Sequence, residues 1–165
     1  MKAISLWEPW ATAIAIGAKK IETRSWATSY RGPLAIHAAK LASHAPGIYA
    51  PLLRPVFAAA GITEFRHLAF GCVVATCRVV DVRRTEVLRD GLGEIELLLG
   101  NYDDDRYGWV LGEVRRLPVP VPARGAQGFW QWDGGPSQLG DTHGRAINQS
   151  PDLFGNGDGA ASTAD

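Results

Sequence analysis

Residues 6–26 read LWEPWATAIAIGAKKIETRSW, and the eight residues GAKKIETR at 17–24 are their most charged part. That run holds three Lys or Arg side chains, one carboxylate and one hydroxyl, and tryptophans lie on both sides of it. Protein cores are built mainly from Val, Leu and Ile, so charges packed this densely between tryptophans indicate the wall of a pocket. The alternative is an exposed helix end and an edge strand whose charges face water.

The same stretch predicts a helix followed by a strand. Pro9 suits the first turn of a helix, and Gly17 stands where that helix should end. From Ile21 the chain is expected to be extended, so alternate side chains from Glu22 onward share one face. Lys19 and Glu22 can therefore meet only if the strand begins after the lysine.

Composition indicates one folded domain with a mildly basic body. The 165 residues are 46% hydrophobic, which is enough for a single core. The formal net charge is zero, but residues 134–165 carry one Arg and four Asp, which leaves a net charge of +3 on the rest. This excess is compatible with an anionic ligand and well short of a strongly cationic nucleic-acid surface. Thirteen of the seventeen cations are Arg, whose planar guanidinium suits bidentate contacts with phosphate or carboxylate.

Cysteine spacing and hydropathy bear on the compartment. Cys72 and Cys77 lie five residues apart in one expected strand, so their side chains should face opposite sides, and neither a disulfide nor a shared metal is expected. The apolar runs are far shorter than the ~18 residues that a membrane span needs. We therefore expect a soluble, cytoplasmic protein with no membrane association.

The remaining patterns predict about six strands with helices inserted between them. Strands are expected at 3–6, 21–26, 34–39, 70–82, 109–117 and 127–132, and further helices at 47–60 and 93–99. Pro51 and Pro55 should break the first of these helices, and the three prolines at 118–122 should bend the chain. Because strands and helices do not alternate regularly, the pattern predicts a β-rich α+β fold, a small and partly closed β-barrel.

The C-terminal segment differs from the rest of the chain. Residues 134–165 contain seven Gly and only four large apolar side chains, which cannot form a second core. We therefore expect one domain at 1–133 and a flexible, disordered tail at 134–165. Within that tail Gln149, Leu153 and Phe154 resemble the short peptides that dock on bacterial sliding clamps, a pattern that arises easily by chance.

Several blocks of sequence, in order, resemble the ASCH (activating signal cointegrator homology) domain, a branch of the PUA-like superfamily. They are ISLWEPWA at 4–11, the spacing GxKxxExR at 17–24, RGPLAIHA at 31–38, GWVL at 108–111 and PARGAQGFW at 122–130. The resemblance covers about residues 2–133 and omits the tail. It implies a PUA-like barrel with a helix beside its mouth, a cleft near the GxKxxExR motif, and association with RNA or nucleotides.

The resemblance leaves the activity open. Some family members resemble amidohydrolases that remove the acyl group of N4-acylcytidine, others look like ribonucleases, and others are RNA-associated or protein–protein coregulator modules. For hydrolysis, Lys19 is the candidate base, Glu22 would orient water or pass on the proton, and Arg24 would hold the developing negative charge. The acylcytidine hydrolases place a threonine where this chain has Glu22, and Thr23 should face the other way. No nucleophile is therefore carried over.

Acidic residues at 94–105 are further candidates. Glu94, Glu96 or one of Asp103, Asp104 and Asp105 could supply the second carboxylate of those hydrolases, although solvated loop charges would look the same. Consecutive carboxylates rarely converge on one ion, so neither a metal nor another cofactor is expected.

A ribonuclease would use His37 as well as the cations, because an imidazole titrates near neutral pH. The alternative for His37 is a packed, hydrogen-bonded core residue.

Binding alone needs the fewest special features. Lys19, Arg24 and Arg124 would contact phosphate, and Trp7 or Trp26 would stack on a base. The sequence thus favours a nucleotide or single-stranded RNA as the partner, with the two enzymatic readings and the coregulator reading as alternatives.

Overall fold

The computed structural model describes residues 1–40 and 46–134, without the side chains of 46–50 and Phe65. Its elements are β1 (Lys2–Leu6), α1 (Trp10–Ala15), β2 (Ile21–Arg24), β3 (Gly32–Ala38), α2 (Pro46–Ala59), η1 (Phe65–His67), β4 (Cys72–Arg84), α3 (Thr85–Leu88), η2 (Arg89–Gly91), α4 (Glu94–Leu98), β5 (Tyr107–Pro122) and β6 (Trp130–Gln131). The predicted tail, with its Gln149, Leu153 and Phe154, lies outside the described residues except for Gly134.

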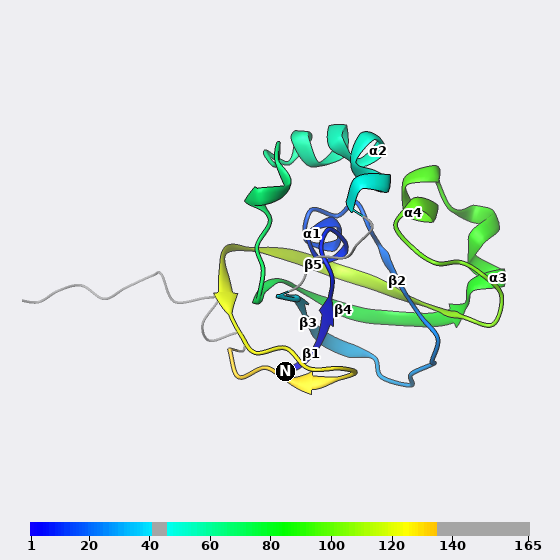
Figure 1. The fold of residues 1–165 in the computed structure, drawn as a ribbon. Coiled ribbons are helices and arrows are strands. Elements are labelled where there is room, and N and C mark those ends of the chain that lie inside the picture. The colour runs from blue at the N-terminus through cyan, green and yellow to red at the C-terminus, as the bar shows by residue number, and fades with distance from the viewer. Residues whose placement is uncertain (41–45, 135–165) are drawn as a thin grey trace, which may run out of the picture.

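The six strands form one mixed sheet in the order β2-β5-β4-β3-β1-β6 (Figure 1). β1 and β3 run parallel, and the other neighbouring pairs are antiparallel. The prediction of a β-rich α+β fold with about six strands is confirmed. β2 and β6 are the two edges of the described sheet, so the sheet is open rather than closed into a barrel.

Three apolar clusters form the core. α1 lies against β3, β4 and β5, and α2 contacts α4 beside it (Figure 1). The first cluster, between α1 and the sheet, includes Ile14, Leu34, Ile36 and Trp109. The second joins α1 to α2 through Ala13, Leu53 and Phe57, and the third packs Trp132 on Ala3, Ala35, Val73 and Leu117. In the described part of the chain, no helix has the length and apolar character needed to cross a bilayer.

α2 is continuous through its two prolines, so the predicted break at Pro51 and Pro55 was wrong. Both prolines are exposed, whereas Leu53 and Phe57 point into the core. Because the prolines are four residues apart, the carbonyls that lose their helical donors lie on the same exposed face, where water can satisfy them.

The prolines at 118–122 also lie inside a strand rather than ending it, since β5 continues to Pro122. The backbone amide of Ala123 donates to the Gly71 carbonyl across the β4–β5 pair, at 3.0 Å. Because the Ala123 amide points toward β4, the missing donor of the adjacent Pro122 lies on the outer edge. β2 pairs only with Tyr107–Val110, so this part of β5 needs no donors on that side.

The two cysteines contact the same apolar cluster, contrary to the predicted opposite faces. One extra residue of β4, between Val73 and Ala75, lies opposite the Ile36–His37 step of β3, and it shifts the side-chain alternation between Cys72 and Cys77. Both are free thiols, and burial raises the pKa of Cys77 to about 12. Neither is therefore a reactive thiolate.

The start of α1 contains a fully buried carboxyl group. One oxygen of Glu8 accepts a hydrogen bond from the Thr12 amide at 3.0 Å, and the other accepts one from the Thr12 hydroxyl at 2.7 Å. Burial raises the pKa of Glu8 from 4.5 to about 7, although both hydrogen bonds oppose this shift. The helix ends at Ala15 with Ile16 as its C-cap, and the predicted stop residue Gly17 follows with a left-handed φ of 77°.

The buried Glu8 should make the fold lose stability as the pH rises. The folded chain binds this proton more tightly, so its stabilisation is fully present below pH 4.5 and is lost as the pH rises through about 7. The loss should reach about 3 kcal/mol. Urea unfolding of the wild type and of Glu8→Gln across this range measures it, and the difference between the two isolates Glu8 from other titrating groups. Parallel pH profiles in the two proteins would contradict it.

Candidate cleft for an anionic ligand

An open cleft of about 1630 Å³ lies where the ends of β1 and β3, strand β2, the residues after α4 and the 122–128 loop meet. The charged side chains that line it are Arg24, Lys40, Arg106, Arg124 and Glu22. Four cations against one carboxylate give this surface a formal charge of +3. A concave surface with such an excess attracts anions.

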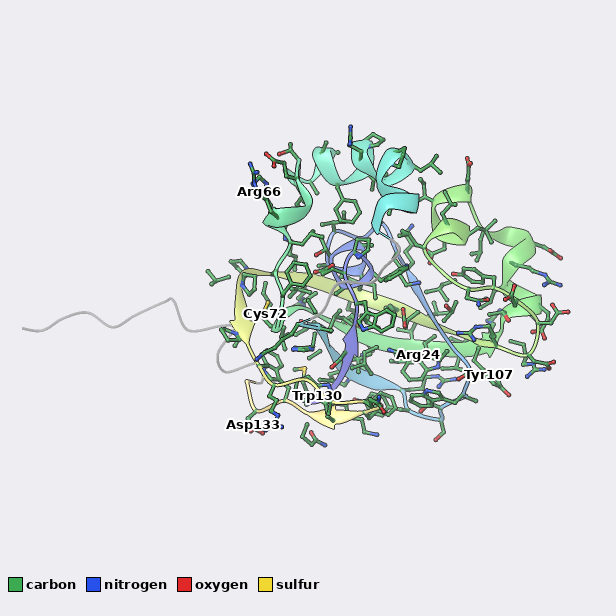
Figure 2. The ribbon with its side chains drawn as sticks, in the orientation of Figure 1. Arg24, Arg66, Cys72, Tyr107, Trp130 and Asp133 are labelled. Atoms are coloured by element: carbon green, nitrogen blue, oxygen red, sulfur yellow. The ribbon has the colours of Figure 1, made fainter. Side chains whose placement is uncertain are left out.

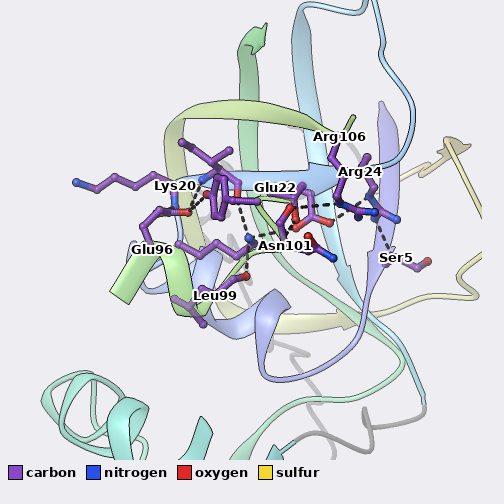
Figure 3. Close-up of polar contacts among 12 residues, drawn as sticks. Ser5, Lys20, Glu22, Arg24, Glu96, Leu99, Asn101 and Arg106 are labelled. Carbon is purple, nitrogen blue, oxygen red and sulfur yellow. Dashed lines mark hydrogen bonds and ion pairs between the residues drawn. The ribbon is translucent and has the colours of Figure 1, made fainter. Parts of the chain in front are cut away.

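Glu22 lies on β2 between two cations, Lys19 and Arg24. Its Oε1 is 3.1 Å from Arg24 Nε, and its Oε2 is 3.6 Å from Lys19 Nζ (Figure 3). Strand β2 begins at Ile21, after Lys19. The sequence pattern required this start for Lys19 and Glu22 to meet. Arg24 also reaches β1, where its Nη2 donates to the Ser5 carbonyl at 3.4 Å.

Lys19 is buried behind the cleft rather than in its wall. Only 1% of the residue is exposed, and its ammonium donates to the carbonyls of Ile21 and Leu99, at 2.6 and 2.8 Å. Burial lowers the pKa of Lys19, and the carboxylates of Glu22 and Glu96 oppose that shift. Of the predicted trio, Glu22 and Arg24 line the cleft and Lys19 does not. The contact between the Lys19 ammonium and Glu22 therefore supports a role for Lys19 in holding Glu22 in place.

Glu96 is used within the scaffold. Its carboxylate accepts hydrogen bonds from the amides of Lys20 and Ile21, at 2.7 and 3.1 Å, and from the Tyr102 hydroxyl at 3.1 Å (Figure 3). Burial, reinforced by this carboxylate, raises the pKa of Tyr102. Glu96 thereby holds α4 to the start of β2.

The neighbouring acidic residues are placed elsewhere. Asp104 accepts from Arg89 and Asp105 accepts from Arg84, each at 2.6 Å, so these two carboxylates point to different partners. They and the exposed Glu94 lie outside the cleft lining.

Three of the four predicted binding residues, Trp7, His37 and Arg124, line the cleft. Trp7 is 57% exposed, so its ring is accessible to a ligand. The fourth, Trp26, lies outside the lining and packs edge-on against Trp109 and Phe129, with ring centroids 4.6 and 5.5 Å apart.

His37 is held by hydrogen bonds at both ring nitrogens. Its Nε2 lies 3.1 Å from the Ala123 carbonyl, which can only accept, so Nε2 carries the proton. Its Nδ1 is then the acceptor for the Ser5 hydroxyl, also at 3.1 Å. Burial lowers the pKa of His37 below its usual 6.5, so the ring is neutral at pH 7. Ser5 Oγ in turn accepts from the indole Nε1 of Trp130 at 3.2 Å (Trp130 is marked in Figure 2).

The ASCH domain family has a sequence model that matches residues 4–119. The chain belongs to the ASCH domain family. Solved structures similar to this ASCH domain are ASCH from Zymomonas mobilis (15% identity, TM-score 0.49, covering 84% of this chain and 91% of that one) and a tyrosine-to-phenylalanine mutant of the same protein (16%, 0.49, 84% and 94%). No curated protein matches the chain.

Sequence reasoning missed several residues that line the cleft of this ASCH domain. Ser5, Lys40, Asn101 and Arg106 come from separate parts of the chain. The signal for Ser5 was weak, because only the parallel register of β1 and β3 sets it opposite His37. The others lie in segments between strands, where no periodicity indicates which way a side chain points.

The buried ammonium of Lys19 should contribute strongly to stability. Lys19→Met leaves two buried carbonyls without their donor and removes one of the two cations beside Glu22, so the free energy of unfolding should fall by about 3–5 kcal/mol. The adjacent Lys20 is exposed, and Lys20→Met should change it by less than about 0.5 kcal/mol. Urea denaturation of both variants gives the comparison. Similar small effects in the two would show that Lys19 is not held as described.

Proposed function

We propose that this ASCH domain binds a nucleotide or single-stranded RNA in the cleft around the GxKxxExR motif. The observation that carries the proposal is the lining, which has four cations and one carboxylate in a chain of zero net charge. Phosphate groups are the anionic ligands for which guanidinium forks are best suited, and three of the four cations are Arg.

The cleft also offers a surface for a base. Trp7 is largely exposed at the cleft, and stacking on an aromatic ring contributes about 1–3 kcal/mol per base. Arg24 is held by Glu22 and by the Ser5 carbonyl, so it presents a guanidinium of fixed orientation. Arg124 is exposed on the 122–128 loop, and it adds charge without such contacts to the part of the chain that the structure describes. A ligand with a flat ring and a phosphate would use both kinds of feature.

Binding should weaken with salt, and Arg124 should account for part of that dependence. Anisotropy of a labelled single-stranded RNA of about ten nucleotides, between about 50 and 200 mM salt, measures the slope. Arg124→Ala should lower the affinity and reduce the slope by about 0.7. The control is Arg66→Ala, because Arg66 is an exposed residue of η1 and lies far from Arg24 (Figure 2).

The same measurement separates binding from the alternatives. An affinity that does not change with salt, or no affinity at all, would remove the proposal and favour a protein–protein coregulator. Shortened RNA recovered from the wild-type sample would indicate a ribonuclease.

Hydrolysis in this cleft is a second candidate, favoured by the position of Glu22. Its carboxylate lines the cleft beside Arg24, where it could orient a water molecule against a bound acyl group while Arg24 holds the oxyanion. Lys19 would act on the reaction through Glu22.

Incubation with N4-acetylcytidine tests this second candidate. Conversion to cytidine should fall by at least about 10²-fold in Glu22→Gln, which removes the carboxylate and keeps the shape of the side chain. Arg66→Ala should leave it unchanged. Absence of conversion in the wild type would remove the hydrolase candidate and leave RNA binding to be judged by its own assay.

A further inference from the structure

A serine, a histidine and a backbone carbonyl form a hydrogen-bonded chain at the cleft. The Ser5 hydroxyl donates to His37 Nδ1, and His37 Nε2 donates to the Ala123 carbonyl, both at 3.1 Å. Ser5 and His37 face each other from β1 and β3, so the pair stands on the sheet rather than on a loop. A hydroxyl within reach of a base, with that base oriented by a third group, is the arrangement of an activated nucleophile.

We infer that Ser5 is a nucleophile activated by His37, and that the cleft can carry out acyl transfer from carboxylic esters or amides that bear a negative charge. The reactivity rests on the Ser5–His37 contact alone. The preference for an anionic substrate rests on the cationic lining that also supports the proposed function.

The reaction needs only the substrate and water. Ser5 Oγ bonds to the carbonyl carbon while its proton moves to His37 Nδ1. The bond to the leaving alcohol or amine then breaks, and that group takes the proton from His37, which leaves an acyl ester on Ser5. Water, deprotonated by the same nitrogen, attacks the ester and releases the acid and the free serine.

Two neighbours and the burial of His37 favour this role. The Trp130 N–H, 3.2 Å from Ser5 Oγ, stabilises negative charge as it develops on that oxygen. Burial lowers the pKa of His37, which keeps the ring in its basic form at neutral pH. Arg24, which donates to the Ser5 carbonyl at 3.4 Å, could receive the oxyanion.

Gly125 packs directly against this pair. A Cβ at this position would lie 2.4 Å from His37 Cε1 and 2.5 Å from Ser5 Oγ. Gly125 is not in the left-handed region, so its lack of a side chain is needed for space rather than for backbone conformation. Any larger residue would cover the hydroxyl.

A fluorophosphonate probe tests the inference on the full chain. Ser5 Oγ would displace fluoride from phosphorus and form a stable adduct, and peptide mass spectrometry locates the modified residue in the wild type without any variant. We expect one adduct, on Ser5. Labelling should be absent in Ser5→Ala, slower by at least about 10²-fold in His37→Gln, and unchanged in Ser29→Ala, which alters an exposed serine outside the cleft lining.

Activated esters then test the substrate class. At low salt, a 4-nitrophenyl ester with a carboxylate on its acyl chain should be hydrolysed at least about tenfold faster than 4-nitrophenyl acetate, because the cleft is cationic. No adduct on Ser5, an adduct on another residue, or labelling that is unaffected in a folded His37→Gln would overturn the nucleophile. A labelled Ser5 with no preference for the anionic ester would overturn the substrate class. Neither result depends on RNA affinity, so failure here and failure of the binding proposal are distinguishable.

Discussion

The buried ammonium of Lys19 is the interaction on which the geometry of the cleft depends. It joins the carbonyl at the start of β2 to the carbonyl of Leu99 after α4, and it lies beside Glu22. A charge removed from water in this way is tolerated only when nearby acceptors replace its hydration. Glu96 adds to these contacts between α4 and β2, because its carboxylate accepts hydrogen bonds from the amides of Lys20 and Ile21. Together these contacts fix β2, and so determine where Glu22 lies.

A second polar network holds the opposite wall. His37 on β3 and Ser5 on β1 bond to each other. His37 also bonds to the Ala123 carbonyl in the 122–128 loop, and Ser5 bonds to the Trp130 indole on β6. Arg24 connects the two networks, because it contacts Glu22 on one side and the Ser5 carbonyl on the other. The cleft therefore lies between two hydrogen-bonded polar networks.

Local sequence patterns correctly predicted those features of the fold that depend on residues close together in the chain. The end of α1 just before Gly17 and the start of β2 at Ile21 both follow from such patterns, and they placed Glu22 and Arg24 together. Predictions failed where strand pairing or solvent exposure decides. The prolines of α2 lie on its exposed face, β5 continues through its own prolines to Pro122, and a bulge in β4 sets the direction of the cysteines. Ser5 and His37, 32 residues apart, meet only through the register of β1 and β3.

The surroundings of Arg24 and Arg124 imply different contributions to binding. Arg24 is ion-paired through Nε and hydrogen-bonded through Nη2. These contacts order its side chain, so its remaining N–H donors have a fixed direction. A phosphate that binds there loses little conformational entropy from the protein, so Arg24 should select ligands by geometry. Arg124 is exposed and lacks comparable contacts among the described residues, so ordering it costs more free energy on binding. Its charge acts before contact, and its main effect should be on the rate at which an anion arrives.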